Sequence, residues 1–300
     1  MNYARTFLVK VRNKLLYYLL IPFSDVTYSK AVYRLRNGRK LNLKDPKLFS
    51  EKLQYLKLRE KNSEYGQYVD KHEGREIVKR LIGGQVLNEQ YFSTESPDEI
   101  DFNSLPDSFV LKLTHGSGFN VICQNKDELD WESTRKLLWR WLRTNYAKEK
   151  REWQYLNVKP RIVCERFLAD ESGSLRDFKF LCFHGVPRLI WVDIDRAGNH
   201  SRAFFDAGWN RVAVEFGRYS QYGGEVPRPD NLEEMLDYAA AMAVGFPFVR
   251  VDFYSISGRT IFGEVTLHPA SGFGEFRPLE YGLEVGSWID LNKTKFSEQR

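Results

Sequence analysis

The sequence contains the segment Phe248-Val249-Arg250-Val251-Asp252-Phe253, followed after a short turn by Ile261-Phe262-Gly263-Glu264-Val265-Thr266-Leu267-His268-Pro269. Successive side chains of a strand point to opposite faces, so Arg250 and Asp252 share one face while the apolar residues share the other. The segment 255–259, with Gly258 at its bend, carries a turn signal. Together these features predict an antiparallel hairpin in which Asp252 lies opposite Glu264.

Two carboxylates would then face each other across adjacent strands. Like charges in this position destabilise a sheet unless a cation lies between them. Two oxygen ligands close to phosphate groups suit magnesium. The alternative is an ion-pair network in which Arg250 bridges both carboxylates, and the sequence leaves both interpretations open.

The pattern Arg-x-Asp-Phe on one strand, with Glu-x-x-x-x-Pro after the next, resembles the metal-binding end of ATP-grasp ligases such as the D-alanine:D-alanine ligases. The string GFPFVRVDFY at 245–254 is similar to the TupA-like branch, which is associated with teichuronopeptide and other bacterial surface polysaccharides. The resemblance extends over nearly the whole chain from about residue 40. It implies an α+β ATP-grasp fold, ATP and Mg²⁺ as cofactors, and Asp252, Glu264 and Thr266 as metal ligands. Because Thr266 stands where those ligases usually have Asn, the number and geometry of the metal ions stay open.

Composition agrees with a cytoplasmic enzyme. The 300 residues are 42% hydrophobic and 15% aromatic, which is ample for a core without disulfides. Cys123, Cys164 and Cys182 are isolated in apolar runs, a pattern typical of buried free thiols rather than of disulfides or a zinc site. The net charge of +5 suits acidic ligands or an anionic surface, and no nucleic-acid-reading motif is present.

The N-terminal stretch combines basic residues at 5, 10, 12 and 14 with an apolar run at 15–21. The run is far shorter than the roughly 20 residues needed to cross a bilayer. No small-residue cleavage site follows it, which argues against a cleaved signal peptide. Its apolar positions fall on one helical face and predict a helix over 5–21 that lies on an anionic membrane. A helix packed on its own domain is the alternative.

Two further segments precede the nucleotide region. Asp45-Pro46 predicts a helix start, with Asp45 as the N-cap and the proline at the first helical position. Phe49, Leu53 and Leu56 lie on the expected buried face. Asp70-Lys71 predicts the opening of another helix. The family resemblance implies that Lys71 reaches the ATP phosphates, although an exposed lysine at a helix start is the more common meaning of such a pair.

A glycine loop at 114–119 separates two β-rich runs, 109–113 and 119–123. Glycine can adopt positive φ and lets backbone N–H groups converge on an anion, so the pattern predicts strand, phosphate loop, strand. An ordinary hairpin turn is the alternative. The resemblance implies that Lys112 on the first strand contacts the triphosphate, which is covered by Gly116, Ser117 and Gly118.

The apolar run at 161–164 predicts a strand that ends in charge. The resemblance implies that the adenine hinge follows, formed by Glu165, Arg166, Phe167 and Leu168. The alternating run at 177–183 predicts a second strand, with Asp177 and Lys179 on a polar face that could hold ribose and phosphate. A simple surface strand would alternate in the same way.

The remaining patterns predict a pair of strands between 187 and 205 and an alanine-rich helix over 231–243. The basic, aromatic segment 131–155 predicts a helix whose tryptophans pack inward. Its other residues could stack on sugar rings or pair with uronic acids. We divide the chain into a helical N-terminal region (1–60), a pre-nucleotide region (61–105) and an ATP-grasp nucleotide-binding and catalytic region (106–290).

The resemblance implies ATP-dependent carboxylate:amine ligation through an acyl phosphate. Arg250 would stabilise charge on the transferred phosphoryl group, together with Lys112, and His115 or His268 would either deprotonate the amine or serve a structural hydrogen bond. The expected partners are an anionic glycan or glycan precursor, an amino acid or small amine, and an anionic membrane on the cytoplasmic side, without nucleic acid. The alternatives are a kinase on the same fold and an inactive membrane-associated scaffold.

Overall fold

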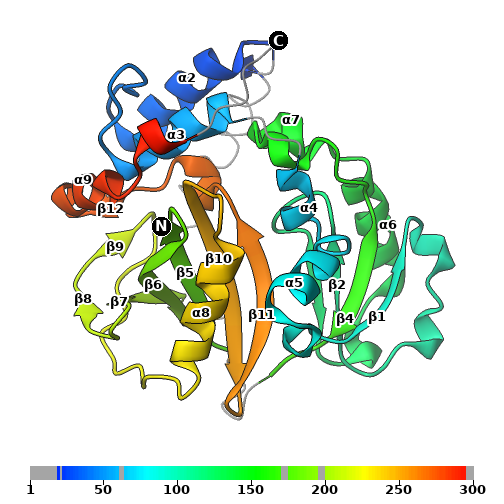
Figure 1. The fold of residues 1–300 in the computed structure, drawn as a ribbon. Coiled ribbons are helices and arrows are strands. Elements are labelled where there is room, and N and C mark those ends of the chain that lie inside the picture. Colours follow the sequence, from blue (N-terminus) through cyan, green and yellow to red (C-terminus); the bar gives the residue numbers. More distant parts are fainter. Residues whose placement is uncertain (1–18, 21, 61–63, 170–174, 195–199, 295–300) are drawn as a thin grey trace, which may run out of the picture.

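The computed structural model describes residues 19–20, 22–60, 64–169, 175–194 and 200–294. Two antiparallel sheets lie side by side, and helices gather at one end of both (Figure 1). The smaller sheet has the order β1-β4-β2-β3, built from β1 (Gln90–Thr94), β2 (Phe109–Leu113), β3 (Asn120–Cys123) and β4 (Ile162–Arg166). The combination of helices with antiparallel sheets confirms the predicted α+β class.

The larger sheet has six strands in the order β11-β10-β5-β6-β7-β8. Its members are β5 (Asp177–Phe183), β6 (Val186–Ile194), β7 (Ser201–Asp206), β8 (Arg211–Val212), β10 (Phe248–Ile256) and β11 (Arg259–Thr266). A two-stranded ribbon joins β9 (Glu215–Phe216) to β12 (Phe276–Arg277). The predicted pair of strands between 187 and 205 is confirmed as β6 and β7.

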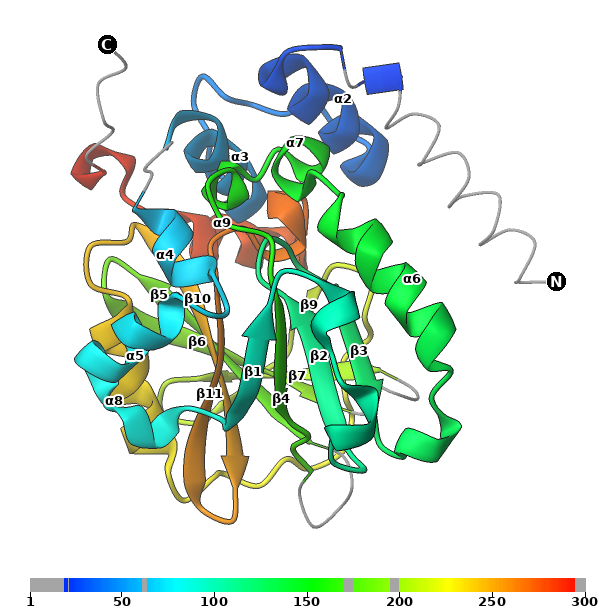
Figure 2. The ribbon, with the colours of Figure 1, turned by 90° about the vertical axis from the view of Figure 1, so that its right-hand side faces the viewer.

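The helices are α2 (Asp25–Asn37), α3 (Phe49–Arg59), α4 (Tyr65–Val69), α5 (Gly74–Ile82), α6 (Trp131–Leu142), α7 (Tyr146–Lys150), α8 (Leu232–Met242) and α9 (Leu279–Ser287). Figure 2 shows α2, α3 and α7 above the sheets and α6 along the outer side of the smaller sheet. The predicted helices at 131–155 and 231–243 are confirmed by α6, α7 and α8. No helix of the described residues is long and apolar enough to cross a membrane.

The β10–β11 hairpin has the predicted register, with Asp252 paired to Glu264. Ser257 and Gly258 form its turn, and both have positive φ (48° and 75°), as the tight connections of twisted hairpins require. One extra residue, Gly263, bulges from β11 beside Asp252. The hairpin prediction is therefore confirmed in both turn and register.

The two faces of the larger sheet differ. The face that carries Val249, Val251 and Phe253 packs against α8. The opposite face is apolar where Phe183 and Leu189 meet α3 and α9, and charged next to that contact. β5 is buried along its whole length between β10 and β6, so the surface-strand alternative for 177–183 is wrong.

The start of α3 corrects one prediction. The helix begins at Phe49, three residues after Pro46, because the Glu51 carboxylate accepts hydrogen bonds from the backbone N–H groups of Lys47 (3.0 Å) and Leu48 (3.1 Å). This acidic side chain supplies the cap that Asp45 was expected to provide. The predicted buried face is confirmed, since Phe49, Leu53 and Leu56 are almost fully buried.

Two other predictions concern the cysteines and the N-terminal helix. Cys123, Cys164 and Cys182 are buried free thiols, as predicted. The membrane-surface helix expected over 5–21 lies outside the described residues except for positions 19 and 20, which are helical.

Candidate active site

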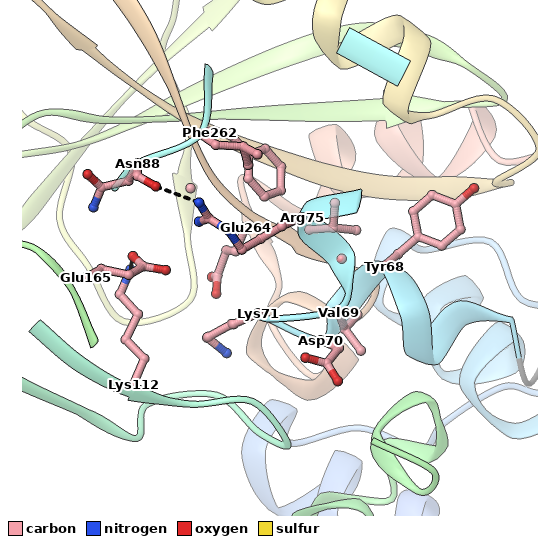
Figure 3. A pocket seen from close by; sticks show the side chains of 14 residues that line it. Tyr68, Val69, Asp70, Lys71, Arg75, Asn88, Lys112, Glu165, Phe262 and Glu264 are labelled. Atoms are coloured by element: carbon pink, nitrogen blue, oxygen red, sulfur yellow. Dashed lines mark hydrogen bonds and ion pairs between the residues drawn. The ribbon is translucent and has the colours of Figure 1, made fainter. Parts of the chain in front are cut away.

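A hollow opens between the edge strand β11 and the inner face of the smaller sheet, under the turn that joins α4 to α5. It brings together four residues that the sequence singled out: Lys71, Lys112, Glu165 and Glu264. Figure 3 shows Lys71 and Glu264 entering from one side, and Lys112 and Glu165 from the other. Residues separated by almost 200 positions in the chain therefore form one charged pocket.

Lys112 and Glu165 face the hollow because their strands bury alternate residues against α6. Leu111 and Cys164 belong to that apolar layer, so the neighbouring side chains point the other way. The Lys112 Nζ and the Glu165 Oε2 lie 2.8 Å apart, and both side chains are mostly buried. The ion pair fixes the lysine at the floor of the pocket.

Lys71 lies in the turn between α4 and α5. Asp70 fixes this turn, because its Oδ1 accepts the N–H groups of His72 (2.8 Å) and Glu73 (3.2 Å). The Lys71 Nζ donates a hydrogen bond to the backbone oxygen of Gly116 at 2.9 Å. Burial lowers the pKa of Lys71, while Glu264 acts in the opposite direction. The lysine thus links the turn to the glycine loop.

The glycine loop connects β2 to β3, which confirms the predicted strand–loop–strand pattern. Gly116 packs so closely on Tyr146 that an added Cβ would lie 2.8 Å from its ring. Gly118 has φ of +82°, which disfavours other residues. A hydrogen bond joins Ser117 to Tyr146. The loop's contact with phosphate stays a prediction.

Arg250 is the centre of a buried network next to the hollow. Its guanidinium donates to Asp252 twice, from Nε to Oδ1 and from Nη2 to Oδ2, each at 2.6 Å. The same Nη2 also reaches Glu264 Oε1 (3.1 Å) and Thr266 Oγ1 (2.9 Å). The ion-pair network that the sequence left as an alternative is present in this structure.

Lys179 extends the network across the sheet. Its ammonium donates to Asp252 Oδ2 at 2.6 Å and to Asp177 Oδ2, and lies 3.8 Å from Asp193. Arg202 in turn donates to Asp193 at 2.6 Å. Burial alone would raise the pKa of Asp193, but Lys179 and Arg202 lower it well below its usual value. Charges of both signs alternate across five strands.

Asp252 and Glu264 keep oxygen atoms that could bind a magnesium ion. A carboxylate offers about four lone-pair sites. Three of those on Asp252 are used by Arg250 and Lys179, so one position on Oδ1 stays available. The Glu264 side chain is 37% exposed and lines the hollow. Among the described residues no three His, Cys, Asp or Glu side chains are placed to hold a metal ion together, so a magnesium ion at Asp252 and Glu264 would take its remaining ligands from phosphates and water.

Three hinge residues lie apart from the hollow. Arg166 is exposed and pairs with Glu89 at 2.7 Å, and Phe167 and Leu168 follow β4 on the way to the larger sheet. Only Glu165 of the predicted hinge lines the pocket. The adenine contact of this segment stays a prediction.

The sequence interpretation missed several residues of the site. Arg75 and Asn88 line the hollow and are joined by a hydrogen bond of 2.8 Å from the guanidinium to the Asn88 backbone oxygen (Figure 3). Asp193 and Arg202 were not among the predicted site residues either. A charge inside an otherwise apolar strand was the available signal for Asp193 and Arg202.

The mixed fold, the glycine loop and the charged hairpin define an ATP-grasp protein. A family model described as TupA-like ATPgrasp matches residues 51–290, and the chain belongs to this family. No curated protein matches the chain.

Solved structures that match the chain include D-alanine–D-alanine ligase from Bacillus anthracis, at 19% identity and a TM-score of 0.40, with 67% of this chain and 57% of that one covered. Phosphoribosylamine–glycine ligase from Thermotoga maritima matches at 15% identity and a TM-score of 0.42, covering 70% and 51%. The ATP-grasp ligase PsnB, in complex with a minimal precursor, Mg and ADP, matches at 12% identity and a TM-score of 0.39, covering 73% and 57%. The chain thus spans little more than half the length of these proteins.

Proposed function

We propose that the protein is an ATP-dependent carboxylate:amine ligase that forms an amide through an acyl phosphate. The observation that carries this proposal is the hollow that places Lys71, Lys112 and Glu264 together, beside Arg250, in a member of the TupA-like ATP-grasp family. Lys71 and Lys112 in the hollow, with Arg250 beside it, supply cations for the phosphates of a nucleoside triphosphate, while Glu264 faces the metal ion that arrives with it.

In the proposed reaction a substrate carboxylate oxygen attacks the γ-phosphorus of ATP, and the bond to the β-γ bridging oxygen breaks, giving an acyl phosphate and ADP. An amine then attacks the acyl carbon, loses one proton and displaces inorganic phosphate. Lys71 and Lys112 hold the phosphates, and Arg250 stabilises charge on the transferred group. The contribution of the protein is chiefly positioning and charge neutralisation.

Asp252 and Glu264 would hold magnesium, which supplies charge neutralisation of the phosphates when bound. Thr266 accepts a hydrogen bond from Arg250 and lies 3.4 Å from Glu264, so its hydroxyl supports the orientation of both groups. Asp177 and Lys179 belong to the buried network, and we propose that Lys179 fixes Asp252 for its role.

The proposed acid substrate is a uronic acid of a bacterial surface polysaccharide or its precursor, and the proposed amine is an amino acid or other small amine. Exposed basic residues along α6 and α7 support an anionic glycan: Arg140, Arg143 and Lys148. Arg143 lies over the ring of Trp139 at 5.4 Å. Arg135 and Arg151 contribute less to such a surface, because Asp98 and Asp25 pair with them.

We also propose a cytoplasmic location with peripheral contact to an anionic membrane. Leu19, Phe23 and Val26 are exposed apolar residues, and Lys30 and Arg34 are exposed on the same helix as Val26. Apolar side chains beside basic ones favour an anionic lipid surface.

The test is a coupled assay with ATP, magnesium, uronic-acid oligosaccharides and a pool of amino acids, with carboxyl-reduced oligosaccharides as the control. The ligase predicts ADP and inorganic phosphate only with the acidic form. Equal ADP release from both forms would refute carboxylate activation, and a phosphorylated sugar would identify a kinase instead.

A further inference from the structure

A second hollow lies at the end of the β10–β11 hairpin. The register explains its position. Asp252 pairs with Glu264 and Arg250 pairs with Thr266, so one more step of the same register reaches Phe248 and His268. Both of these residues line the second hollow. Since two residues of a strand span about 7 Å, this hollow lies directly beyond the residues proposed to handle the transferred phosphoryl group.

Glu60 supplies the charge of this hollow. It follows the last residue of α3, and its Oε1 accepts a hydrogen bond from the Tyr65 hydroxyl at 2.5 Å. Burial raises the pKa of Glu60, and the Tyr65 hydroxyl opposes this effect. No described cation forms an ion pair with Glu60, whereas the carboxylates of the adjacent network face Arg250 and Lys179. A partly buried carboxylate that no described cation compensates favours a positively charged ligand.

His268 supplies a hydrogen-bonding ring to this hollow. It is 92% buried, and within the described part of the chain no hydrogen-bond partner reaches its Nδ1. The imidazole lines the hollow, and a ring nitrogen that carries no hydrogen can accept a hydrogen bond from a ligand there.

The loop after His268 is built with backbone strain. Ala270 and Ser271 have φ of 52° and 56°, a conformation that costs non-glycine residues energy and is found mainly at functional sites. Gln54 and Lys57 hold the loop by donating to the Ser271 backbone oxygen at 2.9 and 2.8 Å, and the Ser271 hydroxyl donates to the buried Glu152 at 2.6 Å. The position of His268 is therefore fixed by several side chains from α3 and the α7 region.

We propose that this hollow is the amine subsite of the ligase, where Glu60 pairs with the ammonium group of a primary amine and His268 accepts one of its hydrogens. The inference rests on the proposed function and adds the location of the second substrate. The polar end of the subsite is formed by Glu60, Tyr65, Gln154 and His268. An amine held there lies next to the acyl group that Arg250 would face.

Binding of ethanolamine tests the subsite without any turnover. We expect ligand-observed NMR to detect ethanolamine but not ethylene glycol, which has the same size and lacks the charge. Glu60→Gln should weaken ethanolamine binding at least tenfold and Tyr65→Phe about threefold or more. The control variant Glu280→Gln changes an exposed glutamate on α9 and should bind like the wild type.

Binding of ATP with magnesium is measured on the same proteins, and its affinity should change less than twofold in Glu60→Gln. Absence of ethanolamine binding to the wild type, or equal binding by wild type and Glu60→Gln, would overturn the amine subsite. If Glu60→Gln does not fold, Tyr65→Phe decides alone, and unchanged binding overturns the proposal. Failure of the wild type to bind ATP would instead contradict the proposed function, so the two failures are distinguishable.

Discussion

Arg250 and Asp252 lie two residues apart on one face of β10, and the guanidinium holds the carboxylate through two parallel hydrogen bonds of 2.6 Å. Both side chains are at least nine-tenths buried. Lys179 adds a second cation to the same carboxylate. Asp252 therefore has two tasks: it compensates two buried cations, and it is a proposed ligand of magnesium.

The double task of Asp252 predicts different stabilities for two variants. Asp252→Asn leaves Arg250 and Lys179 without their shared counter-ion, so we expect a loss of about 3 to 5 kcal/mol in the free energy of unfolding. Glu264→Gln should cost less than about 1 kcal/mol, because this side chain is partly exposed. Both variants should lose turnover. Urea unfolding measures the difference, with the exposed Asp237→Asn as the control, and equal stabilities would show that the network does not depend on Asp252.

Lys71 should matter more for nucleotide binding than for stability. Lys71→Met removes an ammonium group that is destabilised by burial in the pocket. We therefore expect the free energy of unfolding to stay the same or to increase. The affinity for ATP with magnesium should fall at least tenfold in calorimetric titration. Lys136→Met, at an exposed position of α6, is the matched control. Unchanged affinity in Lys71→Met would remove this lysine from the site.

The two loop glycines should respond differently to alanine. Gly116→Ala places a Cβ 2.8 Å from the rings of Phe119 and Tyr146, and such overpacking costs about 1 to 3 kcal/mol. The Cβ of Gly118→Ala would meet no other atom, so the variant should lose stability only through its positive φ, by about 1 to 2 kcal/mol. Thermal unfolding and ATP affinity should both be affected more by Gly116→Ala. The reverse order would mean that Tyr146 does not support the loop.

Lys57 should make stability depend on pH. Burial lowers its pKa to about 7, although the nearby Glu152 acts in the opposite direction. A lysine in the unfolded chain titrates near 10.4. Between these values the unfolded chain holds a proton that the folded protein has released, so stability rises with pH, by at most about 1.4 kcal/mol per unit.

Lys57→Met lacks this contribution. We expect the stability of the wild type, minus that of Lys57→Met, to increase from pH 7 to pH 9 in urea unfolding. Parallel curves for the two proteins would show that Lys57 keeps an ordinary pKa in the fold.

Local sequence patterns were sufficient for the hairpin and the glycine loop. In both, the strands and the turn are adjacent in the chain, so alternation and glycine placement determine the register of Asp252 and Glu264 and the position of Gly116. The predicted start of α3 was wrong because the Glu51 side chain caps the helix. The Asp45-Pro46 pair is a stronger local start signal, although it lies outside the helix. Lys179, Asp193 and Arg202 meet only because β5, β6 and β7 are neighbours, and the order of strands is a long-range property.

The proposed acyl phosphate is tested by following oxygen from the acid substrate into phosphate. Uronic-acid oligosaccharides labelled with ¹⁸O in the carboxylate are incubated with the protein, ATP, magnesium and an amine, and the released phosphate is analysed by mass spectrometry. An acyl phosphate must transfer one carboxylate oxygen to phosphate, so we predict one ¹⁸O atom in each phosphate released with the amide. Amide formation or ATP cleavage that yields unlabelled phosphate would contradict the proposed ligase mechanism.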